Sequence, residues 1–124
     1  MFSHIFVGTS DMDAAKRFYD ATLGTLGVAE GVTDPKGRLF YRTATGTFGV
    51  SRPINGEAAS GANGGTIGFA ASSPEEVKAW HAAGLAHGGT AIEDPPGDRG
   101  KGLWLAYLRD PSGNKVCALC RVKS

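Results

Sequence analysis

The sequence has little of several features that mark specialised classes of protein. It holds two cysteines among 124 residues and no long apolar run, so neither a disulfide-built scaffold nor a membrane-spanning helix is expected. Thirteen basic side chains balance twelve acidic ones, which leaves a net charge of +1. Because neither sign gathers in one stretch, a nucleic-acid-binding face and a basic membrane-binding face are both disfavoured.

The amino terminus lacks the basic segment and the apolar core of a secretory signal peptide. It leads directly into a strand pattern within residues 1–8. With so few cysteines, the chain is expected to work in a reducing, cytoplasmic setting.

Glycine, in contrast, is abundant. The 19 glycines are about twice the usual share in globular proteins, and most of them stand at expected turns and strand ends. This distribution favours many short strands over a helical bundle. Hydrophobic residues make up 41% of the chain, which predicts one globular domain with a sizeable core.

Two segments half a chain length apart follow the same plan. "HIFV", from His4, and "TIGF", from Thr66, each start a strand of period two that leads into an amphipathic helix. Ser10 is expected to cap the first helix and Ser73 the second, each followed three positions later by an acidic residue. The sequence therefore predicts a duplicated strand–helix unit.

Further strands complete each half. Residues 39–50 and 102–122 each predict a hairpin, and the second contains the turn sequence Asp-Pro-Ser-Gly. One more short strand is expected before each hairpin, near residues 27–29 and 89–92. The predicted order is βαβββ, twice.

The two halves are expected to form equivalent modules of a single domain. They span residues 1–58 and 63–124, and the polar, glycine-rich stretch 52–65 connects them. In the first strand, alternation places His4 and Val7 on opposite faces. Val7 is expected to pack against the helix, so that His4 faces the interior of a cavity.

The segments "SHIFVGTSDMDAAKRFYDATLG" and "YLRDPSGNKVCALC" resemble the vicinal oxygen chelate superfamily, which includes glyoxalase I, bleomycin-resistance proteins, fosfomycin-resistance proteins and extradiol dioxygenases. The resemblance covers nearly the whole chain. It implies the α+β glyoxalase/bleomycin-resistance/dioxygenase fold, in which two βαβββ modules form curled mixed sheets that enclose a cavity, with the helices outside. It also implies a homodimer, since chains of this size in the superfamily commonly pair.

The same resemblance implies a divalent metal held by one residue from each of four strands. Matched residue by residue, the first-strand ligand falls on His4, its counterpart in the second half on Thr66, and the last-strand ligand on Cys117. The fourth position falls on Val50 when the arginines that precede the two hairpin turns are aligned. A shift in register would move it toward Ser51 or Arg52.

These residues do not make up a usual metal site. A divalent ion needs at least three protein ligands with lone pairs, whereas Val50 has none and Thr66 offers only a neutral hydroxyl. His4 with Cys117 alone would give a weak, soft site. We therefore expect no cofactor, and a bound divalent metal is the alternative.

Other positions are candidates for contact with a small molecule. Arg52 at a strand end and Arg99 in the loop before the last hairpin could clamp a carboxylate or phosphate, although a solvated loop charge is the favoured interpretation of both. Trp104 and Tyr107 stand at odd spacing in one strand and therefore on opposite faces. At least one of them is expected to line the cavity beside Phe48 or Tyr41.

Cys117 and Cys120 match the pattern C-x-x-C, but they lie in a predicted strand. A spacing of three in a strand points the two thiols to opposite faces, so we expect neither a disulfide nor a redox site.

The sequence favours a metal-free, small-molecule-binding protein of this superfamily, similar in mode to the sequestering bleomycin-resistance members. The reason is the loss of at least two of the four ligand positions. The alternative is a glyoxalase-like lyase or isomerase, or a dioxygenase, with an unorthodox metal site, and fold analogy alone does not decide between them. The expected partners are a small molecule and a second copy of the chain.

Overall fold

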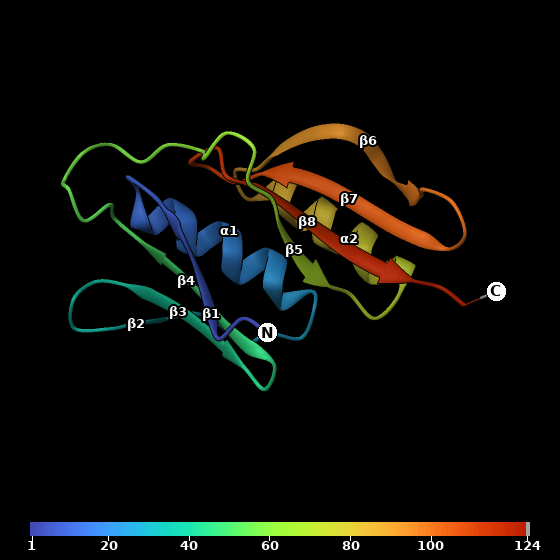
Figure 1. The fold of residues 1–124 in the computed structure, drawn as a ribbon, viewed down its shortest axis with the longest axis horizontal. Coiled ribbons are helices and arrows are strands. Elements are labelled where there is room, and N and C mark those ends of the chain that lie inside the picture. Colours follow the sequence, from blue (N-terminus) through green and yellow to red (C-terminus); the bar gives the residue numbers. More distant parts are fainter. Residues whose placement is uncertain (124) are drawn as a thin grey trace.

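The computed structural model describes residues 1–123. Its helices and strands, in chain order, are β1 (His4–Gly8), α1 (Met12–Gly24), β2 (Val32–Thr33), β3 (Leu39–Thr43), β4 (Gly46–Ser51), β5 (Ile67–Ala70), α2 (Pro74–Ala86), β6 (Thr90–Asp98), β7 (Leu103–Arg109) and β8 (Lys115–Arg121). A strand, a helix and three strands thus follow one another twice, as the sequence predicts (Figure 1).

The strands form two mixed four-stranded sheets, one from each half of the chain. Their orders are β1-β4-β3-β2 and β5-β8-β7-β6. The parallel pairs are β1 with β4 and β5 with β8, which are the first and last strands of each half along the chain. All other neighbouring strands are antiparallel. This arrangement, with one helix in each half, confirms the predicted α+β fold class.

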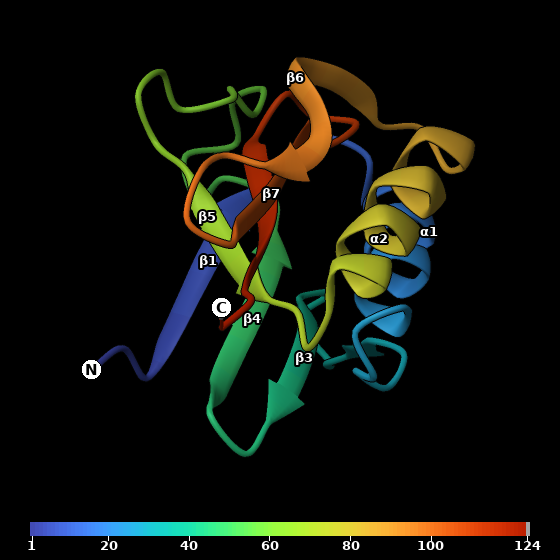
Figure 2. The same ribbon diagram turned by 90° about the vertical axis from the view of Figure 1, so that its right-hand side faces the viewer.

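Both helices lie on the same side of the sheets and pack against each other (Figure 2). Gly84 of α2 permits this contact, because a β-carbon there would overlap Leu108 and lie 3.2 Å from Cε1 of Phe18 in α1. The sequence pattern indicated a helix over each sheet but not this direct contact between the helices. None of the helices in residues 1–123 is long and apolar enough to cross a membrane.

The core lies between the helices and the inner faces of both sheets. Its largest fully buried side chains include Phe18, Tyr19, Leu23, Leu39, Tyr41, Val50, Val77, Trp80, Leu108 and Val116. Alternate residues of β1, β4, β7 and β8 contribute to it, so the opposite face of each sheet points away from the helices.

Helix α1 begins one residue later than predicted. Asp11, not Ser10, is the N-cap, and its carboxylate accepts a hydrogen bond from the Ala14 backbone N–H at 3.0 Å. The Ser10 hydroxyl instead accepts from a backbone N–H of the connection that follows β4, at 2.9 Å. The cap of α2 is as predicted, with Ser73 accepting from the Glu76 N–H at 3.1 Å.

The short strand predicted near residues 27–29 is present but lies later in the chain, as β2 at Val32–Thr33. Residues 27–29 instead follow the end of α1, where the Val28 N–H donates to the Leu23 carbonyl oxygen at 3.1 Å. The strand predicted near residues 89–92 is present but longer. Strand β6 runs on past an irregularity at Glu93, whose φ is 58°.

A buried carboxylate fastens the two halves together. Asp110, in the turn between β7 and β8, accepts a hydrogen bond from the Tyr19 hydroxyl of α1 at 2.7 Å and one from the Asn114 side-chain amide at 2.9 Å. The same amide donates to the Gly8 carbonyl oxygen at 3.0 Å. Burial first, and then the charge of Asp110, raise the pKa of Tyr19 well above its usual value.

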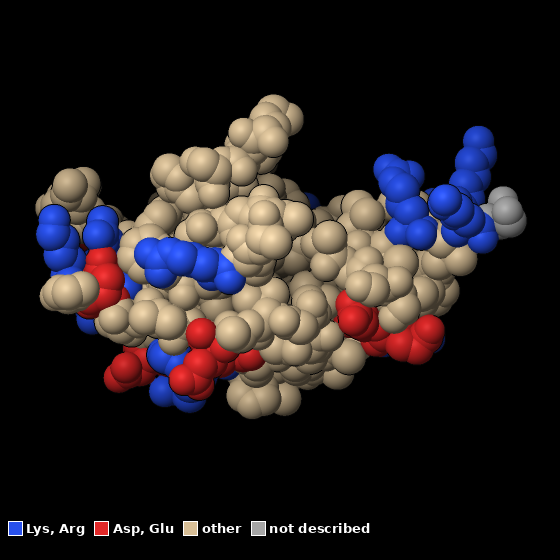
Figure 3. All heavy atoms as spheres, turned by 90° about the horizontal axis from the view of Figure 1, so that it is seen from below, with Lys and Arg blue, Asp and Glu red and all other residues tan. Residues whose placement is uncertain are grey.

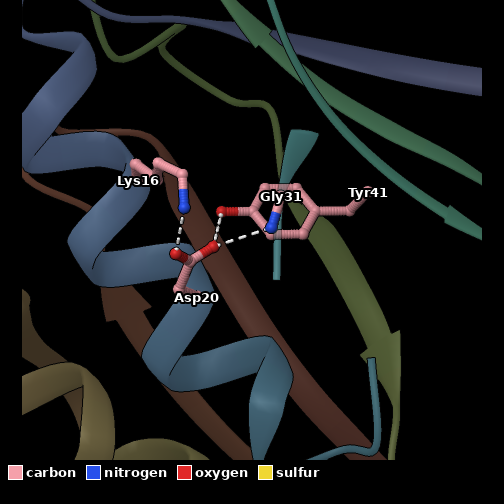
Figure 4. A network of polar contacts seen from close by, with 4 residues as sticks. All are labelled: Lys16, Asp20, Gly31 and Tyr41. Carbon is pink, nitrogen blue, oxygen red and sulfur yellow. Dashed lines mark hydrogen bonds and ion pairs between the residues drawn. The ribbon is translucent and has the colours of Figure 1, made fainter. Parts of the chain in front are cut away.

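A second carboxylate organises the first half (Figure 4). Asp20 of α1 accepts hydrogen bonds from the Tyr41 hydroxyl at 2.7 Å and the Gly31 backbone N–H at 2.9 Å, and it pairs with Lys16 at 2.6 Å. Burial alone would raise the pKa of Asp20, but these three contacts outweigh it and lower the pKa below its usual value.

Candidate functional site

His4 lies on the face of the first sheet that points away from the helices. Its side chain is exposed, and Nδ1 lies 2.7 Å from the Ser3 hydroxyl oxygen. Val7, on the opposite face, packs against the core as predicted. The imidazole is therefore held by a neighbouring hydroxyl and remains open to a ligand.

An apolar row crosses the same face. Phe6, Gly49 and Phe40 are partners in register on β1, β4 and β3. The Phe6 ring lies over Gly49, where any β-carbon would overlap it, and its edge meets the Phe40 ring at a centroid distance of 5.4 Å. The Arg42 guanidinium carbon lies 4.2 Å from the Phe40 ring centroid. The outer face of the first sheet thus carries aromatic rings beside a cation.

The observed register corrects the fourth position of the implied metal site. Gly68 pairs with Cys117 in the second sheet as Phe6 pairs with Gly49 in the first. The counterpart of Cys117 is therefore Gly49, one residue before the predicted Val50, which is fully buried on the helix side. The prediction failed because the two aligned arginines are followed by connections of unequal length: four residues separate Arg42 from its partner Thr47, whereas five separate Arg109 from its partner Lys115.

Cys117 lies on the outer face of the second sheet and is nevertheless buried, next to Gly68 of β5. Burial raises the pKa of its thiol, the charge of Lys115 acts in the opposite direction, and Glu93 adds to the rise. Cys120 faces the core, and both thiols are free. The C-x-x-C pattern is thus split between two faces, as the strand spacing predicts.

Two of the predicted positions lie in separate hollows of the chain. His4 lines a cleft that Phe48 also lines, whereas Thr66 borders another hollow together with Lys115 and Phe6. His4 and Thr66 therefore line different hollows.

Tyr107 and Trp104 lie on opposite faces of β7, as predicted. Tyr107 pairs with Cys117 in register, and the Lys115 ammonium, itself paired with Glu93, lies 4.8 Å from its ring centroid. Trp104 faces the helices, with Lys78 of α2 at 5.2 Å from its ring. Of these two aromatics, Tyr107 is the one on the outer face.

The remaining candidates, Phe48, Arg99 and Arg52, differ in their burial and in their hydrogen bonds. Phe48 is a core residue, with its ring centroid 4.8 Å from that of Tyr19. Arg99, just after β6, donates back to the carbonyl oxygens of Asp94 and Gly97 in that strand. Arg52 is exposed and donates only through Nη1, to the Ser10 carbonyl oxygen at 2.7 Å, and it lines a groove at the end of the first sheet.

The donor set does not fit a divalent metal. Within residues 1–123, no three His, Cys, Asp or Glu side chains are grouped so that they could hold one ion. The four positions implied by the resemblance hold an imidazole, a hydroxyl, a buried thiol and a glycine that an aromatic ring covers. Fewer than three usable ligands remain, which is too few for a stable site.

Sequence reasoning did not find Phe40 and Arg42 as partners of Phe6. The available signal was alternation around Tyr41, which places Phe40 and Arg42 on one face of β3. Their position opposite Gly49 and Phe6 depended on the strand register, which the sequence analysis had placed one residue too late.

The sequence model of the Glyoxalase/Bleomycin resistance protein/Dioxygenase superfamily matches residues 1–118. None of the curated proteins matches the chain. Among solved structures, a glyoxalase/bleomycin resistance protein from Albidiferax ferrireducens is 58% identical, with a TM-score of 0.93. The match covers 98% of this chain and 99% of that one.

Two further crystal structures are similar at lower identity. A glyoxalase-related enzyme from Fulvimarina pelagi is 21% identical, with a TM-score of 0.76 over 96% of this chain and 86% of that chain. A lactoylglutathione lyase from Agrobacterium tumefaciens is 22% identical, with a TM-score of 0.67 over 96% of this chain and 92% of that chain. Both show the fold alone. The superfamily match over nearly the whole chain and the 58% identical relative together mean that this protein belongs to the Glyoxalase/Bleomycin resistance protein/Dioxygenase superfamily.

Proposed function

We propose that this protein binds a small molecule without a metal ion and without changing its bonds, in the manner of a sequestration protein. The observation that carries the proposal is the Phe6 ring over Gly49. At a position where the superfamily places a metal-binding side chain, this chain has a glycine, and an aromatic ring covers the place where that side chain would begin.

The outer face of the first sheet has the chemistry that a small-molecule site needs. Phe6 and Phe40 offer ring faces and edges, Arg42 offers a guanidinium, and His4 offers an imidazole held by one hydrogen bond. Mostly apolar surface with a few polar groups is typical of ligand sites. None of these contacts requires a metal ion.

The proposed working form is a homodimer. Phe6 is 38% exposed and Val32 is 61% exposed on the outer face of the first sheet, and apolar surface of this kind is commonly covered by a second copy. A second copy would also complete a cleft that one chain leaves as separate hollows. We place the protein in a reducing, cytoplasmic setting, where its two thiols stay free.

Assembly is tested by light scattering at micromolar concentration. A mass twice that of the 12.8 kDa chain is expected. The mass of one chain across the micromolar range would contradict the dimer, without bearing on whether the monomer binds a ligand.

The binding proposal is tested by thermal unfolding of chelator-treated protein against a panel of aromatic and amphipathic compounds. A ligand at 100 times its Kd adds about 2.7 kcal/mol to the free energy of unfolding, so a binder should raise Tm by several degrees. Mass spectrometry should recover the compound unchanged. Stabilisation that appears only after a divalent ion is added, or conversion of the compound, would contradict the proposal.

A further inference from the structure

A groove lies at the end of the first sheet, where three segments meet. Its walls are the first turn of α1, the connection between β2 and β3, and residues 51–54 at the end of β4, and Phe6 of β1 reaches it from the outer face. Its volume is about 820 Å³, within the range of about 300–1,000 Å³ that holds drug-sized ligands. A groove of this size suits a small molecule better than a peptide.

Four apolar side chains border the groove. Phe6, Met12, Leu39 and Ile54 contribute, and Ile54 is fully exposed although it is a large aliphatic residue. The Phe6 ring meets the Phe40 ring in a T-shaped contact, so one wall of the groove is aromatic. Burying this surface under a ligand would be favourable.

The charges around the groove are mostly of one sign. Four basic side chains line it, Lys16, Lys36, Arg38 and Arg52, against a single acidic one, Asp13. In Figure 3, basic side chains lie at both ends of the molecule, and carboxylates stand among those at the left-hand end. The groove therefore favours an anion over a cation.

Two of the four basic groups are already neutralised. Lys16 pairs with Asp20 and Arg38 with Asp34, both at 2.6 Å. Among residues 1–123, Lys36 and Arg52 have no carboxylate partner. Arg52 is positioned by its bond to the Ser10 carbonyl oxygen, which leaves its other N–H groups free to donate.

We propose that this groove binds an amphipathic carboxylate, with the apolar body against Phe6 and the carboxylate at Arg52 and Lys36. A guanidinium with free N–H groups suits a carboxylate because it can donate two parallel hydrogen bonds. The proposal rests on the proposed small-molecule binding and names the class of ligand.

The test uses 1-naphthoic acid as the probe and its neutral amide, 1-naphthamide, as the matched comparison, titrated into chelator-treated full-length protein. The acid is expected to bind at least about ten times more tightly than the amide, since a hydrogen bond to a charged group contributes roughly that factor or more. Affinity for the acid should fall as salt is raised. Equal binding of acid and amide would overturn the proposal.

Three variants locate the binding site. Arg52→Gln and Lys36→Gln should each weaken binding of the acid about ten-fold and leave the amide unaffected, whereas Arg121→Gln, at an exposed arginine on β8, should change neither. Arg52→Gln removes the contact with Ser10 and could therefore perturb the fold. Lys36→Gln does not have this drawback, because the Lys36 side chain makes no hydrogen bond in the described residues. Unchanged acid binding in Lys36→Gln and Arg52→Gln would overturn the site. If neither probe binds while another compound stabilises the chelated protein, this inference fails and the proposed function stands.

Discussion

At the scale of single residues, the most constrained polar group is the carboxylate of Asp110. It is 4% exposed and accepts hydrogen bonds from Tyr19, from the Asn114 side chain and from two backbone N–H groups of its own turn. The turn sequence that resembles the superfamily therefore has a structural use in this chain. It holds the β7–β8 turn against α1 and the end of β1.

Removing one of the hydrogen-bond donors to the Asp110 carboxylate should destabilise the folded protein. Tyr19→Phe is expected to lower the free energy of unfolding by about 1–3 kcal/mol, because it leaves a buried charged acceptor with an unsatisfied lone pair. Tyr41→Phe removes the equivalent hydroxyl from Asp20, which is partly exposed, so water can replace it and the loss should be smaller. Urea denaturation of both variants gives the comparison. An equal or smaller loss for Tyr19→Phe would contradict this account of Asp110.

The Asp20 carboxylate should make the free energy of unfolding depend on pH in the acid range. Its pKa in the folded protein is lowered from 3.8, so its contribution to stability is present above that value and is lost as pH falls through the folded-state pKa. Asp20→Asn should therefore be less stable than the wild type at neutral pH, and the gap should narrow below about pH 4. Urea denaturation across this pH range measures it. A gap that stays constant into strong acid would show that the charge of Asp20 is not responsible.

Much at this scale was predictable from local pattern. The faces of His4 and Val7 and the cap at Ser73 follow from strand alternation and from the capping sequence, and both are confirmed. The contacts of Asp110 and of Phe6 were not predictable in the same way. They join residues far apart in the chain, and they depend on how elements meet.

At the scale of elements, the sequence predicted the order of strands and helices better than their register. Alternation and turn residues are local signals, and they placed both hairpins correctly. The length of a turn changes register by a whole residue, which moves a side chain to the other face. This is how Val50 was assigned a position that belongs to Gly49.

The contact between the helices depends on Gly84. Gly84→Ala should lower the free energy of unfolding by about 1–2 kcal/mol, since overpacking beside Leu108 and Phe18 outweighs the gain in helix propensity. Gly24 in α1 is the matched control, because a β-carbon there would meet nothing within 4 Å. Gly24→Ala should raise stability by about 0.4–1 kcal/mol. Thermal or urea unfolding of the two variants measures both changes in the free energy of unfolding. An increase in stability for Gly84→Ala would contradict the packing described.

The position of the Phe6 ring should depend on the absence of a side chain at Gly49. Gly49→Ala would place a methyl group where the ring now lies, and the ring, being 38% exposed, can turn outward. Stability should therefore change by less than about 2 kcal/mol, while the affinity for aromatic ligands falls several-fold. Phe6→Leu is the companion variant, which removes the ring and leaves the backbone. Unaltered aromatic binding in both variants would remove Phe6 from the site.

At the scale of the whole molecule, the fold is that of the superfamily, while the positions that the resemblance implies for metal ligands mostly hold other residues. The family match and the two mixed sheets confirm the architecture that the sequence resembles. Thr66, Gly49 and Cys117 stand at positions to which the resemblance and the strand register together assign metal ligands. A carboxylate-binding groove beside an aromatic face would provide affinity without that ion.

A rebuilt site tests whether the lost residues are what prevents metal binding. Thr66→His with Cys117→Glu should raise the affinity for Ni²⁺ or Zn²⁺ above that of the wild type, because the proposed homodimer, in which a second copy joins the hollows that His4 and Thr66 line, would then offer three ligands to one ion. Calorimetry compares the two proteins. The further change of Gly49→Glu should not add affinity unless the Phe6 ring moves, so its effect is best measured together with Phe6→Ala.

The central claim is that ligand binding in this protein does not depend on a metal. Calorimetric titration of Ni²⁺, Zn²⁺, Mn²⁺ and Fe²⁺ into metal-stripped wild-type protein tests it most directly, with His4→Ala titrated in parallel. The account predicts no stoichiometric binding, and no difference between the wild type and His4→Ala. One ion bound per chain and lost in His4→Ala would contradict it.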